Sequence, residues 1–292
     1  MVITRLKGGL GNQMFQYAIG RSLSFHLNTD FRLDTDFYNN QPSDVTKRRY
    51  LLDCFNIQVT KAKNHELRKI RGIFFGSCIF VFENYIKEFL GIETYFSEKE
   101  VNVYDESVCG FGNDVYLDGY WQTEKYFLQI RSTLLTDFTL KDCASLAYLE
   151  LFEKISSVNS ISLHVRRGDY ITNKSSRETM STCPVEYYHK AIEMLNSKVL
   201  EPVYFVFSDD IGWCKKNLKI DQPVYFVEDN QNYEDLLLMR ACKHNIIANS
   251  SFSWWGAWLN ENPEKVVISP SRWFNNHLYN ADDIVPKSWI KI

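Results

Sequence analysis

The chain has no Cys-x-x-Cys pair, no apolar run long enough to span a bilayer and no excess of basic charge. Its seven cysteines are scattered, which favours free thiols in a reducing compartment over a disulfide framework or a structural zinc site. The net charge of −3 makes a general affinity for nucleic acid unexpected. Because the amino terminus lacks the apolar core of a signal peptide, we expect a cytoplasmic protein.

The longest apolar run, residues 73–82, is interrupted by Gly76 and Ser77 and is too short for a transmembrane helix. The residues before it, 65–71, are basic, so peripheral contact with the inner face of the cell membrane is one interpretation. Apolar runs of this length are more often buried, and we therefore expect a buried element here.

The composition is that of a globular protein, since 45% of the 292 residues are apolar and 24% are charged. Short β-branched segments alternate with helical ones, which indicates an α/β fold with parallel sheets. We predict two domains, 1–155 and 156–292. The first begins with a strand at 2–6, a glycine loop at 7–13 and a helix at 14–27. The second has strands at 161–166, 203–207, 223–227, 244–248 and 265–268, and helices at 184–197, 210–217, 232–242 and 252–260.

Residues 161–170 contain a strand that ends in two arginines and a glycine. Alternation along a strand buries Ile161, Leu163 and Val165 on one side and turns Ser162, His164 and Arg166 to the other. Ligands of open α/β sheets bind at the carboxyl ends of the strands, and the arginine fork matches phosphate oxygens. We predict that Arg166 holds a phosphorylated ligand; the alternative is a solvated arginine pair.

Polar residues also follow two other predicted strands of the second half. Ser208, Asp209 and Asp210 end one of these strands, and their oxygens could accept hydrogen bonds from a ribose or a guanine. The alternative is that Ser208 or Asp209 caps the next helix. Asn249, Ser250, Ser251 and Ser253 open a helix whose hydroxyl-rich start could wrap phosphate oxygens. We expect the tryptophans that follow to be core residues. Three polar strand ends in one half predict a single nucleotide pocket.

Two motifs of the first half are weaker. Gly8-Gly-Leu-Gly-Asn-Gln13 follows a strand and opens a helix, as phosphate-binding loops do, but Met14 stands where a dinucleotide fingerprint needs its third glycine. A tight turn is the alternative interpretation. Asp34-Thr-Asp36 could grip a divalent metal, yet paired acids in loops are usually solvent-facing, and we predict no metal and no other cofactor.

Four segments together resemble the α1,2-fucosyltransferases of glycosyltransferase family 11. They are Gly8-Gly-Leu-Gly-Asn-Gln, His164-Val-Arg-Arg-Gly-Asp-Tyr, Phe207-Ser-Asp-Asp and Asn249-Ser-Ser-Phe-Ser-Trp-Trp-Gly-Ala. The chain is most similar to the bacterial members that build O-antigen or capsular sugars. The resemblance implies a GT-B architecture, two Rossmann-like domains with a cleft between them. It also implies metal-independent, inverting transfer of L-fucose from GDP-β-L-fucose to the 2-hydroxyl of a terminal galactoside, carried by an oligosaccharide or a lipid-linked glycan.

The same resemblance assigns roles to individual residues. It implies that Arg166 grips the β-phosphate, that Asp209 or Asp210 reads guanine or ribose, and that Ser250, Ser251 and Phe252 line the GDP pocket. It places the Gly11–Asn12 segment of the first domain toward the donor. Without a metal, Arg166 is the best placed cation to stabilise charge developing on the leaving diphosphate. The acceptor hydroxyl needs at most one base, for which Asp169 and His164 are candidates.

The acceptor is expected in the first domain, along residues 12–16 and 118–122. Tyr120, Trp121 and Tyr126 could stack on a sugar there, although most aromatic residues are core. The loop 177–182 is a candidate for closing over the site. Two alternatives belong to other classes: a nucleotide-sugar-binding protein without catalysis, and a nicotinamide-dependent oxidoreductase, which the missing glycine disfavours.

Overall fold

The computed structural model describes residues 1–41, 47–73, 75–77, 79–89, 94–168, 170, 173, 178–275 and 281–292. The chain forms two compact units: Met1–Lys141 with Asp282–Ile284, and Asp142–Ala281 with Val285–Ile292. The first boundary therefore falls earlier than the predicted residue 155. The reason is a helix that was not predicted, α5 (Leu146–Ser156), which packs against α10 (Asn232–Ala241) of the second unit.

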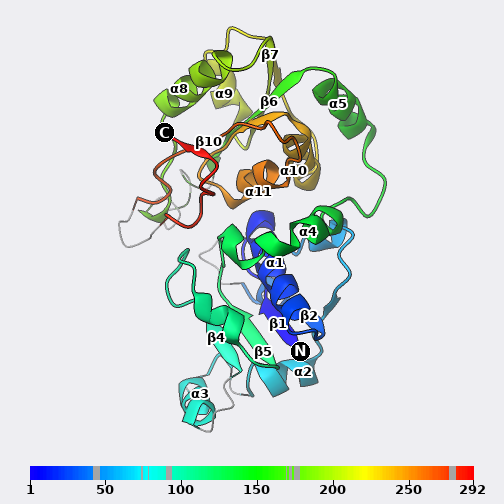
Figure 1. Ribbon diagram of the computed structural model, residues 1–292, viewed down its shortest axis with the longest axis vertical. Helices are drawn as coiled ribbons and strands as arrows, with labels where there is room; N and C mark the ends of the chain where they lie inside the picture. Colours follow the sequence, from blue (N-terminus) through cyan, green and yellow to red (C-terminus); the bar gives the residue numbers. More distant parts are fainter. Residues whose placement is uncertain are drawn as a thin grey trace. The chain divides into compact units, whose positions relative to one another are not determined.

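The first unit is built on a five-stranded sheet in the order β3-β2-β1-β5-β4, and every strand pair in it is parallel (Figure 1). Its strands are β1 (Val2–Arg5), β2 (Phe31–Asp34), β3 (Thr60–Lys61), β4 (Tyr95–Ser97) and β5 (Val115–Asp118). Its α-helices are α1 (Leu10–His26), α2 (Asn64–Ile70), α3 (Phe80–Phe89) and α4 (Arg131–Asp137). Short 3-10 helices lie at Asp36–Tyr38, Leu52–Cys54, Glu106–Gly110, Glu124–Tyr126 and Leu128–Ile130.

The second unit has a six-stranded parallel sheet in the order β11-β10-β9-β6-β7-β8. Its strands are β6 (Asn159–Val165), β7 (Pro202–Ser208), β8 (Val224–Phe226), β9 (His244–Ile246), β10 (Val267–Ser269) and β11 (Ile290–Lys291). Besides α5 and α10, its helices are α8 (Val185–Asn196), α9 (Ile211–Asn217) and α11 (Ser251–Leu259). All elements predicted between residues 161 and 268 are present, with ends shifted by a few residues.

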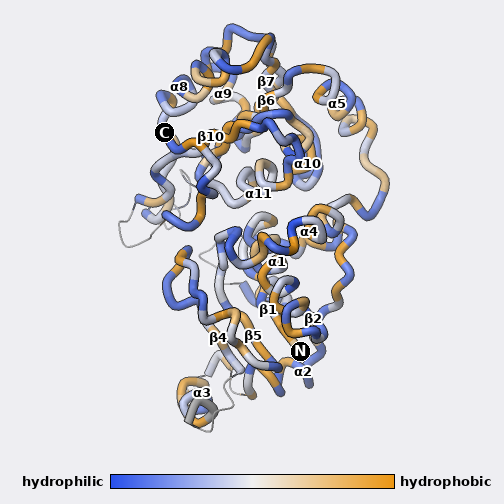
Figure 2. The backbone as a smooth tube through the Cα atoms, in the orientation of Figure 1, coloured by the Kyte–Doolittle hydropathy of each residue, from blue (hydrophilic) through white to orange (hydrophobic). Residues whose placement is uncertain are grey.

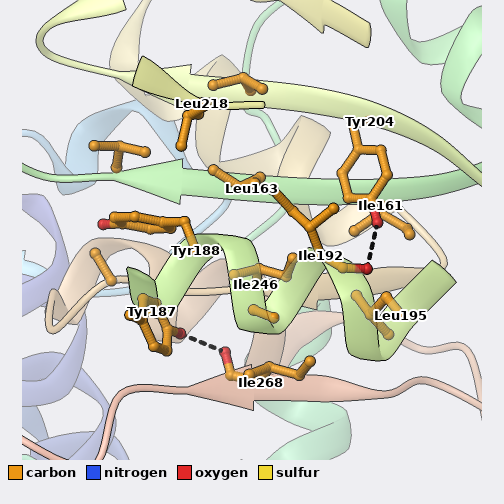
Figure 3. Packing of buried hydrophobic residues seen from close by; sticks show 14 of the residues in the cluster. Ile161, Leu163, Tyr187, Tyr188, Ile192, Leu195, Tyr204, Leu218, Ile246 and Ile268 are labelled. Atoms are coloured by element: carbon orange, nitrogen blue, oxygen red, sulfur yellow. Dashed lines mark hydrogen bonds between the residues drawn. The ribbon is translucent and has the colours of Figure 1, made fainter. Parts of the chain in front are cut away.

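Both faces of this second sheet are buried, as parallel sheets require. Ile161, Leu163 and Val165 pack with Tyr187, Tyr188 and Ile192 of α8 on one face, while Phe205 and Phe207 pack with Leu238 and Met239 of α10 on the other. In Figure 3 the phenol groups of Tyr187 and Tyr204 donate hydrogen bonds to the carbonyl oxygens of Ile268 and Ile192, each at 3.2 Å. The predicted alternation along β6 is confirmed, so His164 and Arg166 belong to the side opposite α8.

Strand order fixes where each unit can hold a ligand. In the second unit the chain proceeds from β6 outward through β7 and β8, then returns to β9 on the other side of β6. In the first unit β1 likewise has β2 on one side and β5 on the other. We call the point where the strand order changes direction the reversal of the sheet. There the loops leave two neighbouring strands in opposite directions and open a crevice at the carboxyl ends. The segments after β6, β9, β1 and β5 are therefore the candidate binding loops.

The apolar segment at residues 73–82 corrects one expectation. It was predicted to be buried, yet Ile73, Ile79, Val81 and Phe82 are all exposed, whereas Phe75 and Phe80 are partly buried and both contact Tyr95. The prediction failed because residue type measures the tendency to be buried, not whether another element is available to cover the side chain. Among the described helices, none combines the length and the apolar character needed to cross a membrane.

Candidate active site

Arg166 lies directly after β6, the central strand at the reversal of the second sheet. Its Nη1 is 3.0 Å from Oδ2 of Asp209, which follows the neighbouring strand β7, and its guanidinium carbon lies 5.6 Å from the ring centroid of Tyr170. The side chains of Arg166 and Asp209 are each 25% exposed. Arg166 thus lies at the carboxyl edge of the sheet, as predicted. Asp209 holds its guanidinium group, and a quarter of its side chain stays exposed.

The carboxylates of Asp209 and Asp210 have different partners. Oδ1 of Asp209 accepts a hydrogen bond from the backbone N–H of Arg167 at 2.9 Å, so this residue holds both arginines. Asp210 caps α9 by accepting from Trp213 N–H at 3.0 Å, and Ser208 Oγ accepts from Asp210 N–H at 2.9 Å. The cap was expected at Ser208 or Asp209, but the structure places it one residue later, at Asp210. Contact of Ser208, Asp209 or Asp210 with a nucleotide stays a prediction.

Gly168 is required by the close approach of Asp209. A Cβ atom added at residue 168 would lie 2.7 Å from Oδ2 of Asp209, the oxygen that holds Arg166. We expect Gly168→Ala to displace this carboxylate and to lower kcat/KM by about 10- to 100-fold, because small misplacements of positioning groups are costly. Thermal unfolding should change little. Gly212→Ala is the matched control, since a Cβ there meets nothing within 4 Å, and its kcat/KM should equal that of the wild type.

His164 is buried, being 4% exposed, and its ring lies 5.8 Å from that of Phe252. Burial, reinforced by the positive charge of Arg166, lowers the pKa of His164 to about 3. The imidazole is therefore neutral, and a group whose conjugate acid is this strong is a weak proton acceptor. Asp169, the other candidate base, lies outside the described residues, as do residues 171–172 and 174–177.

The turn after β9 is built by the residues that were predicted to wrap phosphate. Asn249 is fully buried, and its Nδ2 donates to the carbonyl oxygens of Ser181 and Trp273 at 2.5 and 2.9 Å. Ser250 caps α11 by accepting a hydrogen bond from Phe252 N–H at 3.3 Å. Asn249 and Ser250 thus shape the turn, whereas Ser251 and Phe252 are half-buried.

The glycine segment of the first unit is a tight turn that leads at once into α1, which begins at Leu10 and not at residue 14. Gly8 has a φ of +81°, and a Cβ there would lie 2.5 Å from Nδ2 of Asn12. Gly11 and Asn12 therefore belong to the first turn of the helix. Oδ1 of Asn12 accepts a hydrogen bond from Gln122 Nε2 at 2.8 Å, which joins the loops after β1 and β5 at the reversal of this sheet.

The loop after β5 is held by a carboxylate that sequence reasoning missed. Glu98 accepts hydrogen bonds from the backbone N–H groups of Tyr120, Trp121 and Asn102 at 2.7, 3.1 and 3.1 Å. Its burial raises its pKa despite these donors. Trp121 has a φ of +58° and is 1% exposed. Trp121 and Tyr126 are therefore core residues and offer no stacking surface, whereas Tyr120 is half-buried with Lys7 Nζ 4.9 Å from its ring centroid.

Asp34 and Asp36 both contact Arg71. The Nη1 of Arg71 lies 2.7 Å from Oδ2 of Asp34 and 3.2 Å from Oδ2 of Asp36, and Tyr116 also donates to Asp34 at 2.5 Å. The two carboxylates that were considered as metal ligands are therefore both paired with an arginine of the same chain.

Asp235, in the first turn of α10, is a second residue that the sequence did not reveal. Burial raises its pKa to about 6, and Asn230 Nδ2 donates to its Oδ1 at 3.2 Å. It follows β8 and so belongs to the carboxyl edge of the second sheet.

Comparison with known proteins identifies relatives of this chain. A family model for glycosyl transferase family 11 matches residues 1–292. The chain is 36% identical over 296 residues to an alpha-1,2-colitosyltransferase of Escherichia coli, covering 100% of this chain and 99% of the relative. It is 35% identical over 301 residues to the O-antigen biosynthesis glycosyltransferase WbnK of Escherichia coli, covering 98% and 99%. A human galactoside alpha-(1,2)-fucosyltransferase 1 is 27% identical over 161 residues, 49% of this chain and 42% of that protein.

The fold has solved counterparts. The NodZ alpha-1,6-fucosyltransferase of Bradyrhizobium, in crystals soaked with GDP-fucose, matches 88% of this chain and 91% of its own with a TM-score of 0.53 and 14% identity. The two parallel-sheet α/β units have the GT-B fold, as predicted, and the family match makes the chain a glycosyltransferase. The chain belongs to glycosyl transferase family 11.

Proposed function

We propose that this glycosyltransferase transfers L-fucose from GDP-β-L-fucose to the 2-hydroxyl of a terminal galactoside, with inversion and without a metal ion. The observation that carries the proposal is the Arg166–Asp209 pair at the reversal of the second sheet. Arginine there offers a planar fork to the oxygens of a diphosphate. The fold match to a fucosyltransferase soaked with GDP-fucose and the partial match to α1,2-fucosyltransferases support the choice of donor.

The chemistry follows from where charge develops. When the bond from C1 of fucose to the β-phosphate oxygen breaks, the electron pair stays on the diphosphate, and Arg166 stabilises that charge. The acceptor hydroxyl attacks from the opposite face, which inverts the anomeric carbon. Asp169 is proposed as the base, because the low pKa of His164 makes that imidazole a weak acceptor. His164 instead packs beside Phe252 and shapes the pocket.

The acceptor is proposed to bind the first unit, at the joined loops after β1 and β5. Asn12 and Gln122 link these loops, and Tyr120 is the aromatic residue with an open surface there. Lys7 adds a cation beside that ring. A galactose-terminated glycan is the matching chemical class, since sugars pack on aromatic faces and bind amide groups through their hydroxyls.

The test is incubation of the purified protein with GDP-fucose, EDTA and a panel of β-galactosides, followed by linkage analysis of the product. We expect release of GDP and an α1,2-linked fucoside. Binding of GDP-fucose with no turnover on any acceptor would instead identify a nucleotide-sugar-binding protein. Product formation that needs an added divalent metal would contradict the role of Arg166.

A second donor has specific support, because the colitosyltransferase relative matches the whole chain. Colitose is fucose without its 3-hydroxyl, so GDP-colitose carries the same diphosphate and the same reacting carbon. Parallel reactions with the two donors distinguish them through the ratio of kcat/KM. A site that hydrogen-bonds the 3-hydroxyl rejects the deoxy sugar strongly, because its own polar groups are then left unpaired.

A further inference from the structure

The first unit carries an exposed apolar surface that the transferase reaction does not use. Fourteen large hydrophobic side chains are exposed in the described part of the chain, and six of them lie between residues 73 and 86. They are Ile73 (70% exposed), Ile79 (48%), Val81 (75%), Phe82 (63%), Tyr85 (66%) and Ile86 (41%). A cluster of this kind on a globular protein marks an interaction site more often than isolated exposed residues do.

Helix α3 has its apolar face turned outward. Phe80 contacts Phe75 and Tyr95, with ring centroids 5.1 and 4.9 Å apart, and Glu83, one turn later, accepts a hydrogen bond from Ile73 N–H at 3.1 Å. These contacts fix the face that packs on the unit. At 3.6 residues per turn, Val81, Phe82, Tyr85 and Ile86 fall on the opposite face. Figure 2 shows the hydrophobic residues of α3 at the margin of its unit.

Positive charge lies directly before this surface. The last turn of α2 carries Arg68 and Lys69, both exposed, and Lys63, the residue before the helix, is exposed as well. The one acidic residue of α2, Glu66, is turned inward and bonds the backbone N–H of Lys63 at 2.6 Å. Gly72 packs against the Glu83 carboxylate, so the end of α2 and the start of α3 are adjacent.

We propose that α3 and the last turn of α2 form a docking surface for an anionic lipid bilayer. In this arrangement α3 lies in the membrane plane, with Val81, Phe82, Tyr85 and Ile86 among the upper acyl chains and Arg68 and Lys69 at the lipid phosphates. A ten-residue helix is about 15 Å long, which suits a helix that lies on a membrane and not one that spans it.

The charge pattern favours a membrane over a second copy of the chain. A symmetric dimer formed through this surface would place the same patch against itself, and Arg68 and Lys69 would face their own counterparts. Lys69 is paired with Asp114 at 2.8 Å, but its side chain stays 71% exposed and reaches solvent. An anionic bilayer satisfies both the apolar face and the cations beside it.

The experiment is sedimentation of the full chain with vesicles of phosphatidylcholine alone or mixed with phosphatidylglycerol. We expect binding to the anionic vesicles, weakened by added salt. Phe82→Ser should lower the partition coefficient by about tenfold or more, since it removes a large apolar side chain from the contact. Arg68→Gln should lower it by about fivefold, the usual contribution of one cation near an anionic surface.

Two matched variants test whether the loss of vesicle binding is specific to this surface or follows from removing any exposed phenylalanine or cation. Phe25→Ser removes an equally exposed phenylalanine (69%) from the end of α1, and Lys190→Gln removes an exposed cation from α8. Neither should alter vesicle binding. All four variants should keep wild-type thermal unfolding and wild-type turnover of a soluble acceptor, because none of these side chains belongs to the candidate site.

Three results would overturn the proposal. The first is no binding of the wild type to anionic vesicles, and the second is equal binding by the wild type and Phe82→Ser. The third is a concentration-dependent dimer in analytical ultracentrifugation that Phe82→Ser abolishes, which would assign the surface to self-association.

Discussion

Arg166→Ala should lower kcat by about 10²- to 10³-fold, the usual effect of removing one group that stabilises charge developing in a transition state. Arg166 lies at the end of the central strand of the second sheet and is held by Asp209 at 3.0 Å. Arg166→Lys should also be poor, because an ammonium keeps the charge but loses the fork. Initial rates with GDP-fucose and a saturating acceptor measure the effect on kcat, and a GDP titration measures the loss of binding.

The matched control is Arg240→Ala. Arg240 belongs to the same unit and also pairs with a carboxylate, Glu261, at 2.7 Å, but it lies in α10 and not at the strand edge. Its loss should leave kcat unchanged, because Arg240 lies outside the candidate site. If Arg166→Ala retained wild-type kcat while GDP binding fell, Arg166 would be a ground-state ligand only, and another group would have to stabilise the leaving diphosphate.

Much of the second unit could be predicted from the sequence, because its strands are short β-branched runs that parallel packing buries on both faces. The start of α8 after Pro184 was also predicted, whereas the cap of α9 is Asp210 and not Ser208 or Asp209 as expected. The position of Arg166 at a sheet edge followed from the length of β6 alone. What the sequence could not give was the partner of this arginine, since Asp209 is brought beside it only by the pairing of β6 with β7.

The failures have physical reasons of the same kind. Asn249 was predicted to bind phosphate because its amide is a good donor, but in the fold that amide bonds the carbonyl oxygens of two distant segments. Glu98 gave no local signal, because its role depends on a turn more than twenty residues later in the chain. Trp121 was weighed as a sugar platform, and its burial depends on how the loop after β5 folds back. Contacts made across long sequence separations decide each case.

The acid sensitivity of the fold should depend strongly on His164. Its pKa is about 3 in the native protein because burial and the charge of Arg166 disfavour the imidazolium, whereas an exposed histidine has a pKa near 6.5. Below pH 6.5 the unfolded chain therefore binds a proton that the native chain does not. Stability falls as the pH falls, by about 1 kcal/mol for each pH unit, and the loss continues until the pH approaches 3. Urea unfolding at pH 7, 6 and 5 measures this slope.

His164→Gln isolates the contribution of this residue, because glutamine retains a polar side chain but does not titrate. Other described groups also contribute to the slope. His244, whose pKa burial also lowers, acts in the same direction, and Asp235, with a pKa of about 6, and Glu98, whose pKa burial raises, act in the opposite one. All three are present in the wild type and in the variant, so the difference between the two slopes belongs to His164. We expect the variant to be less stable at pH 7 but to lose less stability by pH 5. Parallel slopes would mean that His164 is protonated in the native state near pH 6, and the neutral, pocket-shaping role proposed for it would then be wrong.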